Sequence, residues 1–148
     1  DDLVIEVLNP PAGTSPDTLP EGYSSLGAVH INNVSSVVKL THGENSFLFT
    51  ADIYTSREME LVNDYGEALK SDVIVAPHHG DDTSSSMRFI EAVDPKIAIS
   101  PSNLIFSVNV MDKYEYHGSE LYHSFFNGNI LLLSDGKDIN VITEKERE

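Results

Sequence analysis

Short apolar runs rich in β-branched residues recur along this chain and predict the strands of a sheet. Runs at 3–8, 32–41 and 46–50 predict the first three strands, and turn-forming residues at 42–45 join the second and third as a hairpin. A proline- and glycine-rich stretch at 9–22 predicts a long surface loop. Since the first strand begins almost at residue 1, with no initiating methionine, we expect the chain to be a piece of a longer protein.

After residue 52 the apolar spacing changes from two residues to about 3.6, the period of a helix. Apolar positions from Met59 to Leu69 predict a helix that starts with Ser56 as its N-cap. Further along, the pattern predicts strands at 73–76 and 97–100, helices at 87–93 and 119–126, an irregular excursion at 101–113 and a closing hairpin at 130–142. This alternation favours a single α/β domain over 1–148, with a mixed sheet and helices on one face.

Composition and charge narrow the class of protein. The 148 residues include 24 acidic and 9 basic side chains, for a formal net charge of −15. A field of this sign repels nucleic acid and anionic membranes, so nucleic acid is not expected as a partner of this acidic piece. The absence of cysteine excludes disulfides and thiolate metal ligands. No apolar run approaches the roughly 20 residues that span a bilayer, so no membrane segment is expected.

Side chains that bind metals follow three of the predicted strands. Asp52 follows the strand at 46–50, the pair His78–His79 follows the strand at 73–76, and the strand at 97–100 leads toward His117. Ligands in open α/β sheets gather at the carboxyl ends of the strands, so we expect these residues to share one site. Imidazole and carboxylate ligands without thiolates suit zinc, manganese or iron.

Each of these residues also has a plainer structural interpretation. Asp52 suits a cap or a turn, adjacent histidines point apart so that at most one usually enters a site, and His117 suits a surface position before a helix. The remaining histidines and a serine run are expected to be structural or solvent-exposed, with the serines capping a helix: His30, His42, His123 and 84–86.

The order of the motifs resembles the C-terminal part of metallo-β-lactamase-fold hydrolases, and most of all the competence proteins of the DNA-uptake channel and their free-standing bacterial relatives. In that branch one strand ends in Thr-Gly-Asp, the next ends in Pro-His-His-Gly-Ser, a Pro-Lys strand follows, and Gly-His-Pro precedes the last helix. The matching stretches here are Thr50-Ala51-Asp52, Pro77-His78-His79-Gly80, Pro95-Lys96 and Tyr116-His117-Gly118.

The resemblance implies an αββα-type fold of which this chain is the C-terminal half. It also implies roles for the candidate residues. Asp52 matches an aspartate that bridges two metal ions, and His117 matches the last histidine ligand. Of the histidine pair, His78 is assigned as a metal ligand and His79 as the catalytic residue, although the exchange of these two roles stays open. The implied ions are two zinc ions, with manganese as an option.

Several departures from the pattern weaken the implied site. Ala51 replaces the glycine, Asp81 replaces the serine, and the family's main metal motif, His-x-His-x-Asp-His, is absent from the chain. Three candidate ligands are fewer than two metal ions need. We therefore expect the chain alone to be catalytically inactive, and whether the longer parent protein is an enzyme stays open.

Two functions are consistent with this reading. The first is the C-terminal part of a metal-dependent hydrolase that acts on a small or cell-surface phosphodiester or a similar ester. The second is a non-catalytic binding or assembly domain that keeps the fold. In both, the bare sheet face is expected to pair with the missing N-terminal half or with a second copy of the chain. The resemblance indicates a bacterial parent that is exported or faces the outer side of a membrane.

Overall fold

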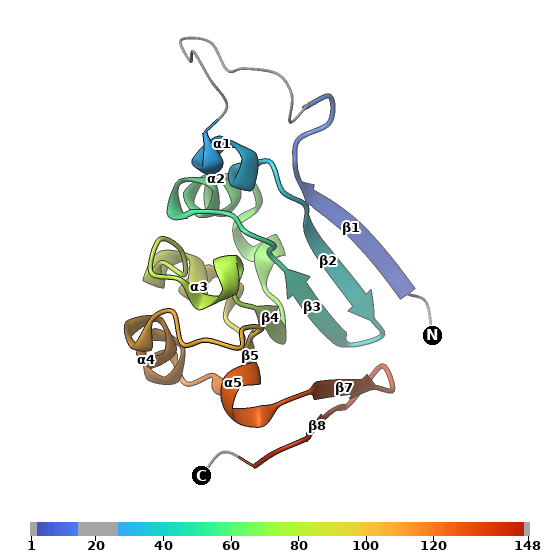
Figure 1. The fold of residues 1–148 in the computed structure, drawn as a ribbon. Coiled ribbons are helices and arrows are strands. Elements are labelled where there is room, and N and C mark those ends of the chain that lie inside the picture. Colours follow the sequence, from blue (N-terminus) through green and yellow to red (C-terminus); the bar gives the residue numbers. More distant parts are fainter. Residues whose placement is uncertain (1–2, 15–26, 147–148) are drawn as a thin grey trace.

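A computed structural model of the chain describes residues 3–14 and 27–146, and its centre is a six-stranded mixed sheet (Figure 1). The strands lie side by side in the order in which they occur in the sequence. They are β1 (Leu3–Asn9), β2 (Val37–His42), β3 (Asn45–Phe49), β4 (Val73–Val75), β5 (Ile97–Ser100) and β6 (Glu120–His123). The first three strands pair antiparallel, and β3 to β6 pair parallel. The expected α/β fold with a mixed sheet is confirmed.

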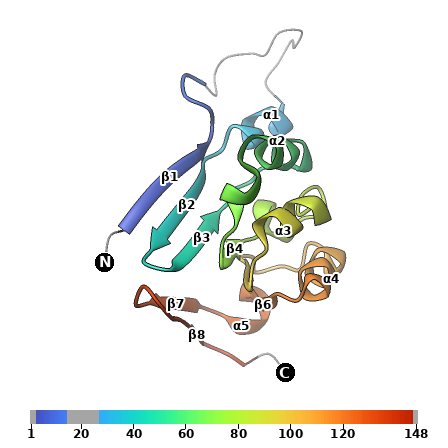
Figure 2. The same ribbon diagram turned by 180° about the vertical axis from the view of Figure 1, so that it is seen from behind.

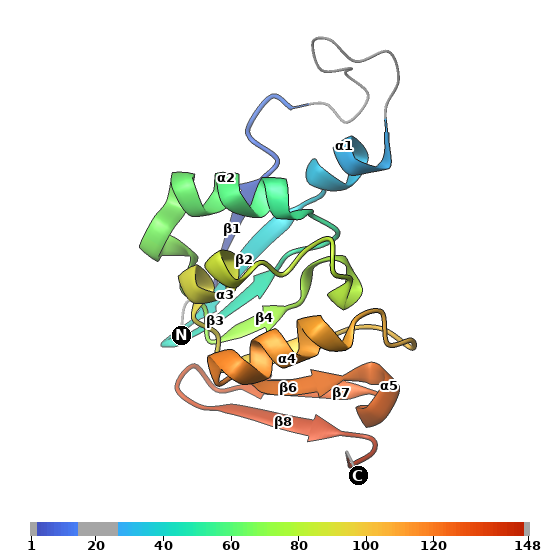
Figure 3. The same ribbon diagram turned by 90° about the vertical axis from the view of Figure 1, so that its left-hand side faces the viewer.

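One face of the sheet is covered by three helices that follow β3, β4 and β5 (Figure 3). They are α2 (Thr55–Tyr65), α3 (Met87–Val93) and α4 (Val108–His117), and a 3₁₀ turn, η1 (Gly66–Leu69), extends α2. Their apolar sides and the facing strand residues form the main core. Its largest fully buried apolar side chains include Tyr114, Phe89, Leu48, Ile74 and Ile90.

A two-stranded hairpin, β7 (Ile130–Ser134) and β8 (Ile139–Thr143), lies against the other face of the sheet (Figure 2). Its residues Ile130, Leu132 and Ile139 pack on Phe47 and Ile99, among others, as a second, smaller core. This arrangement leaves the outer strand of the same face uncovered. Leu3, Ile5 and Val7 of β1 are 58, 61 and 63% exposed.

Three parts of the fold differ from the sequence prediction. The strand expected at 32–41 starts only at Val37, because 28–33 form a short helix, α1 (Ala28–Asn33). The stretch 101–113, expected to be irregular, contains most of α4, which Ser107 caps by accepting a hydrogen bond from the Val110 N–H. The helix expected at 119–126 is instead β6 followed by one turn, α5 (Ser124–Asn127), because pairing with β5 holds 120–123 extended.

Other local predictions are confirmed or corrected in detail. The helix at 87–93, its Ser86 N-cap and the strand at 97–100 are confirmed. The N-cap of α2 is Tyr54 and not Ser56, and its side chain makes no capping hydrogen bond. Most of the loop expected at 9–22 lies outside the described residues. Among the helices that the structure describes, none has the length and apolar character needed to cross a bilayer.

Candidate functional site

Three loops meet at the edge of the sheet where the parallel strands end. The first follows β3 and carries Asp52, the second follows β4 and carries His78 and His79, and the third begins at Pro101 after β5. The second loop forms a short 3₁₀ segment, η2 (Pro77–Gly80). Parallel strands end at the same edge, so these loops are neighbours in space although about 25 residues separate each from the next.

Asp52 and His79 form an open polar pair at this edge. The Nε2 atom of His79 lies 3.4 Å from Oδ1 of Asp52, and their side chains are 50% and 43% exposed. Both groups therefore remain accessible to a ligand. The structure brings these two predicted site residues together.

Strained backbone holds the pair in place. Three non-glycine residues next to the pair or within it adopt left-handed conformations: Ala51 at φ 47°, His78 at φ 50° and His79 at φ 57°. Such conformations cost roughly 1–2 kcal/mol per residue and persist only where the surroundings enforce them. Two hydrogen bonds hold these backbone conformations, one between the two loops and one from β5. The His78 N–H donates to the Ala51 carbonyl at 2.9 Å, and the Ser100 hydroxyl donates to the His79 carbonyl at 3.0 Å.

His78 points away from the Asp52–His79 pair. Its Nδ1 atom lies 3.0 Å from the Thr83 hydroxyl oxygen, and its ring packs on Tyr54 with centroids 4.8 Å apart. The centroids of the two histidine rings are 6.5 Å apart. His78 also lies near Asp81, whose pKa is lowered mainly by hydrogen bonds from the Thr83 side chain and backbone. In this arrangement His78 organises the loop, and His79 is the member of the pair that faces Asp52.

Residues of the turn before β2 form hydrogen bonds with the loop that carries Asp52. The Asp52 N–H donates to the Ser35 hydroxyl at 3.3 Å, and the Tyr54 N–H donates to the Asn33 carboxamide oxygen at 2.8 Å. Asn9, at the end of β1, donates to the carbonyls of both Asn33 and Ser35. Residues from β1, the 33–35 turn and the loop after β3 thus form one hydrogen-bonded support for Asp52.

A buried carboxylate supports the second loop. Glu58 of α2 is fully buried, and its two oxygens accept the N–H groups of Ser85 and Ser86 at 2.5 and 2.9 Å. Burial raises the pKa of Glu58, against the opposing effect of these hydrogen bonds and of Lys113. Ser86 of the serine run caps α3, as expected, and the Ser84 hydroxyl donates to the Pro77 carbonyl, which joins the run to the histidine loop.

The structure does not bring His117 to this site. His117 is the last residue of α4, and its Nε2 lies 3.2 Å from Oδ1 of Asp94, which precedes β5. Both residues therefore lie at the edge where the parallel strands begin. The four residues of β5 separate that edge from Asp52 and His79 by about 10 Å or more.

The residue that does approach His79 from the third loop is Phe106. Its ring centroid lies 6.4 Å from that of His79. In the motif order given above, Gly-His-Pro lies between the Pro-Lys strand and the last helix. Here the helix after that strand is α4, and Ile105-Phe106-Ser107 precede it. An aromatic ring thus lies near His79 in the stretch between β5 and α4, and the sequence prediction, which treated this stretch as irregular, gave no signal for it.

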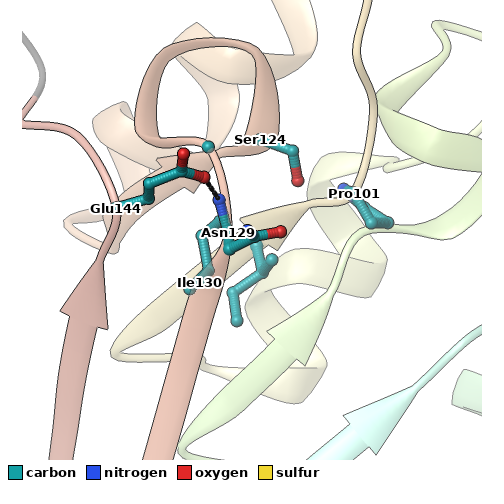
Figure 4. Close-up of a pocket in the computed structure, with 7 residues that line it drawn as sticks. Pro101, Ser124, Asn129, Ile130 and Glu144 are labelled. Carbon is teal, nitrogen blue, oxygen red and sulfur yellow. Dashed lines mark hydrogen bonds between the residues drawn. The ribbon is translucent and has the colours of Figure 1, made fainter.

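Two pockets lie near this edge of the sheet and share Pro101 in their linings. One, of about 380 Å³, is lined by His79, Pro101, Ser102, Asn103 and Phe106. The other, of about 400 Å³, lies between the end of β5 and the start of β7. Figure 4 shows Glu144 and Pro101 on opposite sides of this second pocket, with Ser124 and Asn129 between them. Its polar residues carry no motif, so sequence reasoning gave no signal for them.

The described residues do not by themselves fit the two-metal site that the resemblance implies. No group of three or more histidine, aspartate or glutamate side chains in 3–14 and 27–146 could hold a metal ion. Asp52 and His79 offer two donors, His78 is turned toward Thr83, and Phe106 offers none. A tetrahedral zinc ion needs three or four protein ligands.

Comparisons with known proteins relate the chain to bacterial competence proteins. No family model matches the chain. It is 34% identical over 102 residues to competence protein ComA of Neisseria gonorrhoeae and 33% identical over 98 residues to ComE operon protein 3 of Bacillus subtilis, in both cases over 66% of the chain. It is also 38% identical over 72 residues, 49% of the chain, to the uncharacterized protein YcaI of Escherichia coli. The chain spans only 10 to 15% of the length of these relatives. Its sequence is thus competence-protein-like, a relationship carried by one short part of much longer proteins.

Proposed function

We propose that this chain forms the C-terminal half of a metallo-β-lactamase-type domain and contributes one side of a metal-dependent hydrolase site to a longer, competence-protein-like parent. The observation that carries the proposal is the Asp52–His79 pair, exposed at the carboxyl edge of the sheet and held there by left-handed backbone. Strain that is stored around an accessible polar pair is typical of functional sites. The similarity to bacterial competence proteins supports the same assignment.

In this proposal each residue has a defined task. Metal ions in the completed site, zinc or manganese, would supply Lewis acidity and activate water. Asp52 would provide a carboxylate ligand, and His79 would donate a hydrogen bond to the charge that develops on the ester oxygen. His78 would keep the loop in shape through Thr83 and Tyr54. The remaining ligands would come from residues outside those described here.

The charge of the chain favours a small substrate. A net charge of −15 opposes the approach of a long polyanion, whereas a single phosphodiester or similar ester carries little charge of its own. We therefore propose a small or cell-surface ester, which would place the parent outside the cell or on the outer side of a membrane.

The experiment compares the chain with the longest natural polypeptide that contains it. With zinc or manganese and a chromogenic phosphodiester, the 148 residues alone should show no turnover. The longer protein should hydrolyse the ester, and Asp52→Asn should abolish that activity while Asp94→Asn, at the opposite edge, leaves it unchanged. Hydrolysis by the isolated chain, or an active Asp52→Asn parent, would contradict the proposal.

If the chain is half of a domain, the other half should pack on the sheet, and the uncovered face of β1 supports this. Three apolar side chains in a row on that face, Leu3, Ile5 and Val7, are more than half exposed. The isolated chain should therefore bind a hydrophobic dye or self-associate, as light scattering would show. A monomer that binds no dye would argue against a missing partner.

A non-catalytic binding or assembly domain is the second candidate, and one observation favours it. Phe106 packs near His79 where a further ligand would be needed, so the site has the appearance of one that has lost a donor. The sequence upstream of residue 1 in the parent discriminates between the candidates. An intact His-x-His-x-Asp-His supports the hydrolase, and its loss supports the binding domain.

A further inference from the structure

The pocket that shares Pro101 with the His79 pocket has a chemistry of its own. Its apolar lining residues are Ile99, Pro101 and Ile130, and its polar ones are Ser124, Asn129 and Glu144. At about 400 Å³ it lies within the range of small-molecule sites. The lining includes one carboxylate and no lysine or arginine.

The carboxylate of Glu144 is exposed and accepts one backbone hydrogen bond. Its Oε2 accepts the Asn129 N–H at 3.1 Å, as the dashed line in Figure 4 marks, and the Glu144 N–H donates to the Asn129 carbonyl at 2.9 Å. Gly128 has φ +66°, and a Cβ atom there would lie 2.6 Å from Oε2. A glycine is therefore needed beneath the carboxylate. Among the described residues, Oε1 of Glu144 accepts no further hydrogen bond.

These groups select against anions and in favour of hydroxyl groups. A phosphate or carboxylate in the pocket would face Glu144 with no cation to compensate, whereas a hydroxyl group can donate to it. Ser124 and Asn129 can each donate and accept hydrogen bonds. A lining that mixes apolar side chains with a carboxylate, a hydroxyl and an amide suits a ring or chain that carries several hydroxyl groups on a carbon frame.

We infer that this pocket binds a neutral, polyhydroxylated group, such as a sugar ring, as the non-reacting arm of the substrate. Pro101 lines both this pocket and the one that contains His79, so a group held here can carry an attached ester toward His79. The link to the ester rests on the proposed function. The recognition of hydroxyl groups rests on the pocket alone.

Binding is measured without turnover, so the test is independent of hydrolysis. The chain is titrated with glucose, ribose and inorganic phosphate while backbone amide signals are followed by NMR. The sugars should shift signals from 124–130 and 144, and phosphate should leave them unchanged. Glu144→Gln keeps an acceptor for the Asn129 N–H but removes the charge, and it should weaken sugar binding about tenfold. Glu67→Gln, an exposed substitution on η1, is the matched control and should have no effect.

Several results would overturn the inference. One is the absence of sugar-dependent shifts at about 50 mM ligand, a concentration at which even weak small-ligand contacts are seen. Others are phosphate binding at these residues and unchanged sugar binding in Glu144→Gln. A chain that binds sugars while its parent fails to hydrolyse esters would refute only the proposed function. An active parent protein whose pocket binds no sugar would refute only this inference.

Discussion

The two edges of the parallel strands differ in how their polar side chains are satisfied. At the edge where the strands begin, Asp72 accepts hydrogen bonds from the N–H and hydroxyl of Ser46, both at 2.9 Å, and from Lys96 at 2.7 Å. At the edge where they end, Asp52 lies open to solvent beside His79 at 3.4 Å. The first edge is a closed network that stabilises the sheet. The second keeps polar groups available for a ligand.

Positive φ values occur at both edges. Ala51, His78, His79 and Gly80 have them where the strands end, and Asp94 and Gly118 have them where the strands begin. His117 belongs to the other edge, where it pairs with Asp94. A histidine between two strands is therefore no sign of a site by itself. What matters is whether it follows a strand or precedes one.

The largest expected effect comes from removing the buried support of the histidine loop. Glu58→Ala leaves the Ser85 and Ser86 N–H groups without their acceptor inside the core, and should lower the free energy of unfolding by about 3 kcal/mol. Urea denaturation measures the loss. Glu60→Ala, on the exposed side of the same helix, should cost less than about 0.5 kcal/mol. Equal effects of the two substitutions would refute the role given to Glu58.

The pH dependence of the same group gives a signed test. Burial raises the pKa of Glu58 in the folded state, so the native protein binds more protons than the unfolded chain at pH values between the two pKa values. Its contribution to stability is therefore fully present below the unfolded pKa and falls as the pH rises through that window. Glu58→Gln should flatten this part of the stability curve, and an unchanged slope would contradict the argument.

A smaller loss is expected from Gly80→Ala, which tests the strained edge. Gly80 has φ +82°, and an added Cβ atom would lie 2.7 Å from the Ser100 hydroxyl oxygen that holds the His79 carbonyl. The substitution should cost about 2 kcal/mol, from the backbone conformation and the displaced hydroxyl together. Gly118→Ala also has positive φ but meets no atom within 4 Å, so it should cost about half as much in the same denaturation experiment. A cost for Gly80→Ala no greater than the control would show that Ser100 moves freely.

At the edge where the parallel strands begin, the stabilising contribution of Asp72 should change with pH in the opposite direction from that of Glu58. Burial acts against ionisation of Asp72, but hydrogen bonds from Lys96 and Ser46 outweigh it and lower its pKa. Its stabilising contribution is present above the unfolded pKa and is lost as the pH falls through the lower, folded pKa. Asp72→Asn should cost about 1–2 kcal/mol at neutral pH and reduce the acid-induced loss of stability. A variant with the acid transition of the parent sequence would contradict this assignment.

The smallest expected effect is an increase in the free energy of unfolding. Ala51 is exposed at φ 47°, where glycine pays no steric penalty. Ala51→Gly should raise the free energy of unfolding by about 0.5 kcal/mol, the difference between relieved strain and the added flexibility of the unfolded chain. Ala92→Gly, inside α3, should lower it by up to about 1 kcal/mol. If thermal melts show a loss at both positions, the backbone at Ala51 is not strained.

Much of the open edge could be predicted from the sequence, because its signals are local. An apolar run followed by Asp52, and another followed by Pro77-His78-His79, mark strand ends wherever the strands pair. The helix at 87–93 also has strong local signals, a serine N-cap before it and Pro95 after it. These features need no knowledge of distant residues.

The errors occur where distant residues decide the structure. Residues 120–123 carry helix-like flanking signals, yet they form β6 because β5 offers them a parallel partner. The mixed composition of 101–113 also gives no clear helical period, although α4 begins at Val108, and His117 at its end lies beside Asp94 and not beside His79. The pocket around Glu144 was equally out of reach, because its lining comes from β5, α5, β7 and the end of β8.

The central claim is that Asp52 and His79 form one side of an incomplete metal site, and zinc titration by calorimetry tests it most directly. The 148-residue chain should show no site tighter than about millimolar, because two donors hold zinc weakly. Phe106→His should bind zinc at least about tenfold more tightly, since it adds a second imidazole near His79, whose ring centroid lies 6.4 Å from that of Phe106. Asp52→Asn should remove that gain. Stoichiometric, submicromolar zinc binding by the unaltered chain would contradict the account.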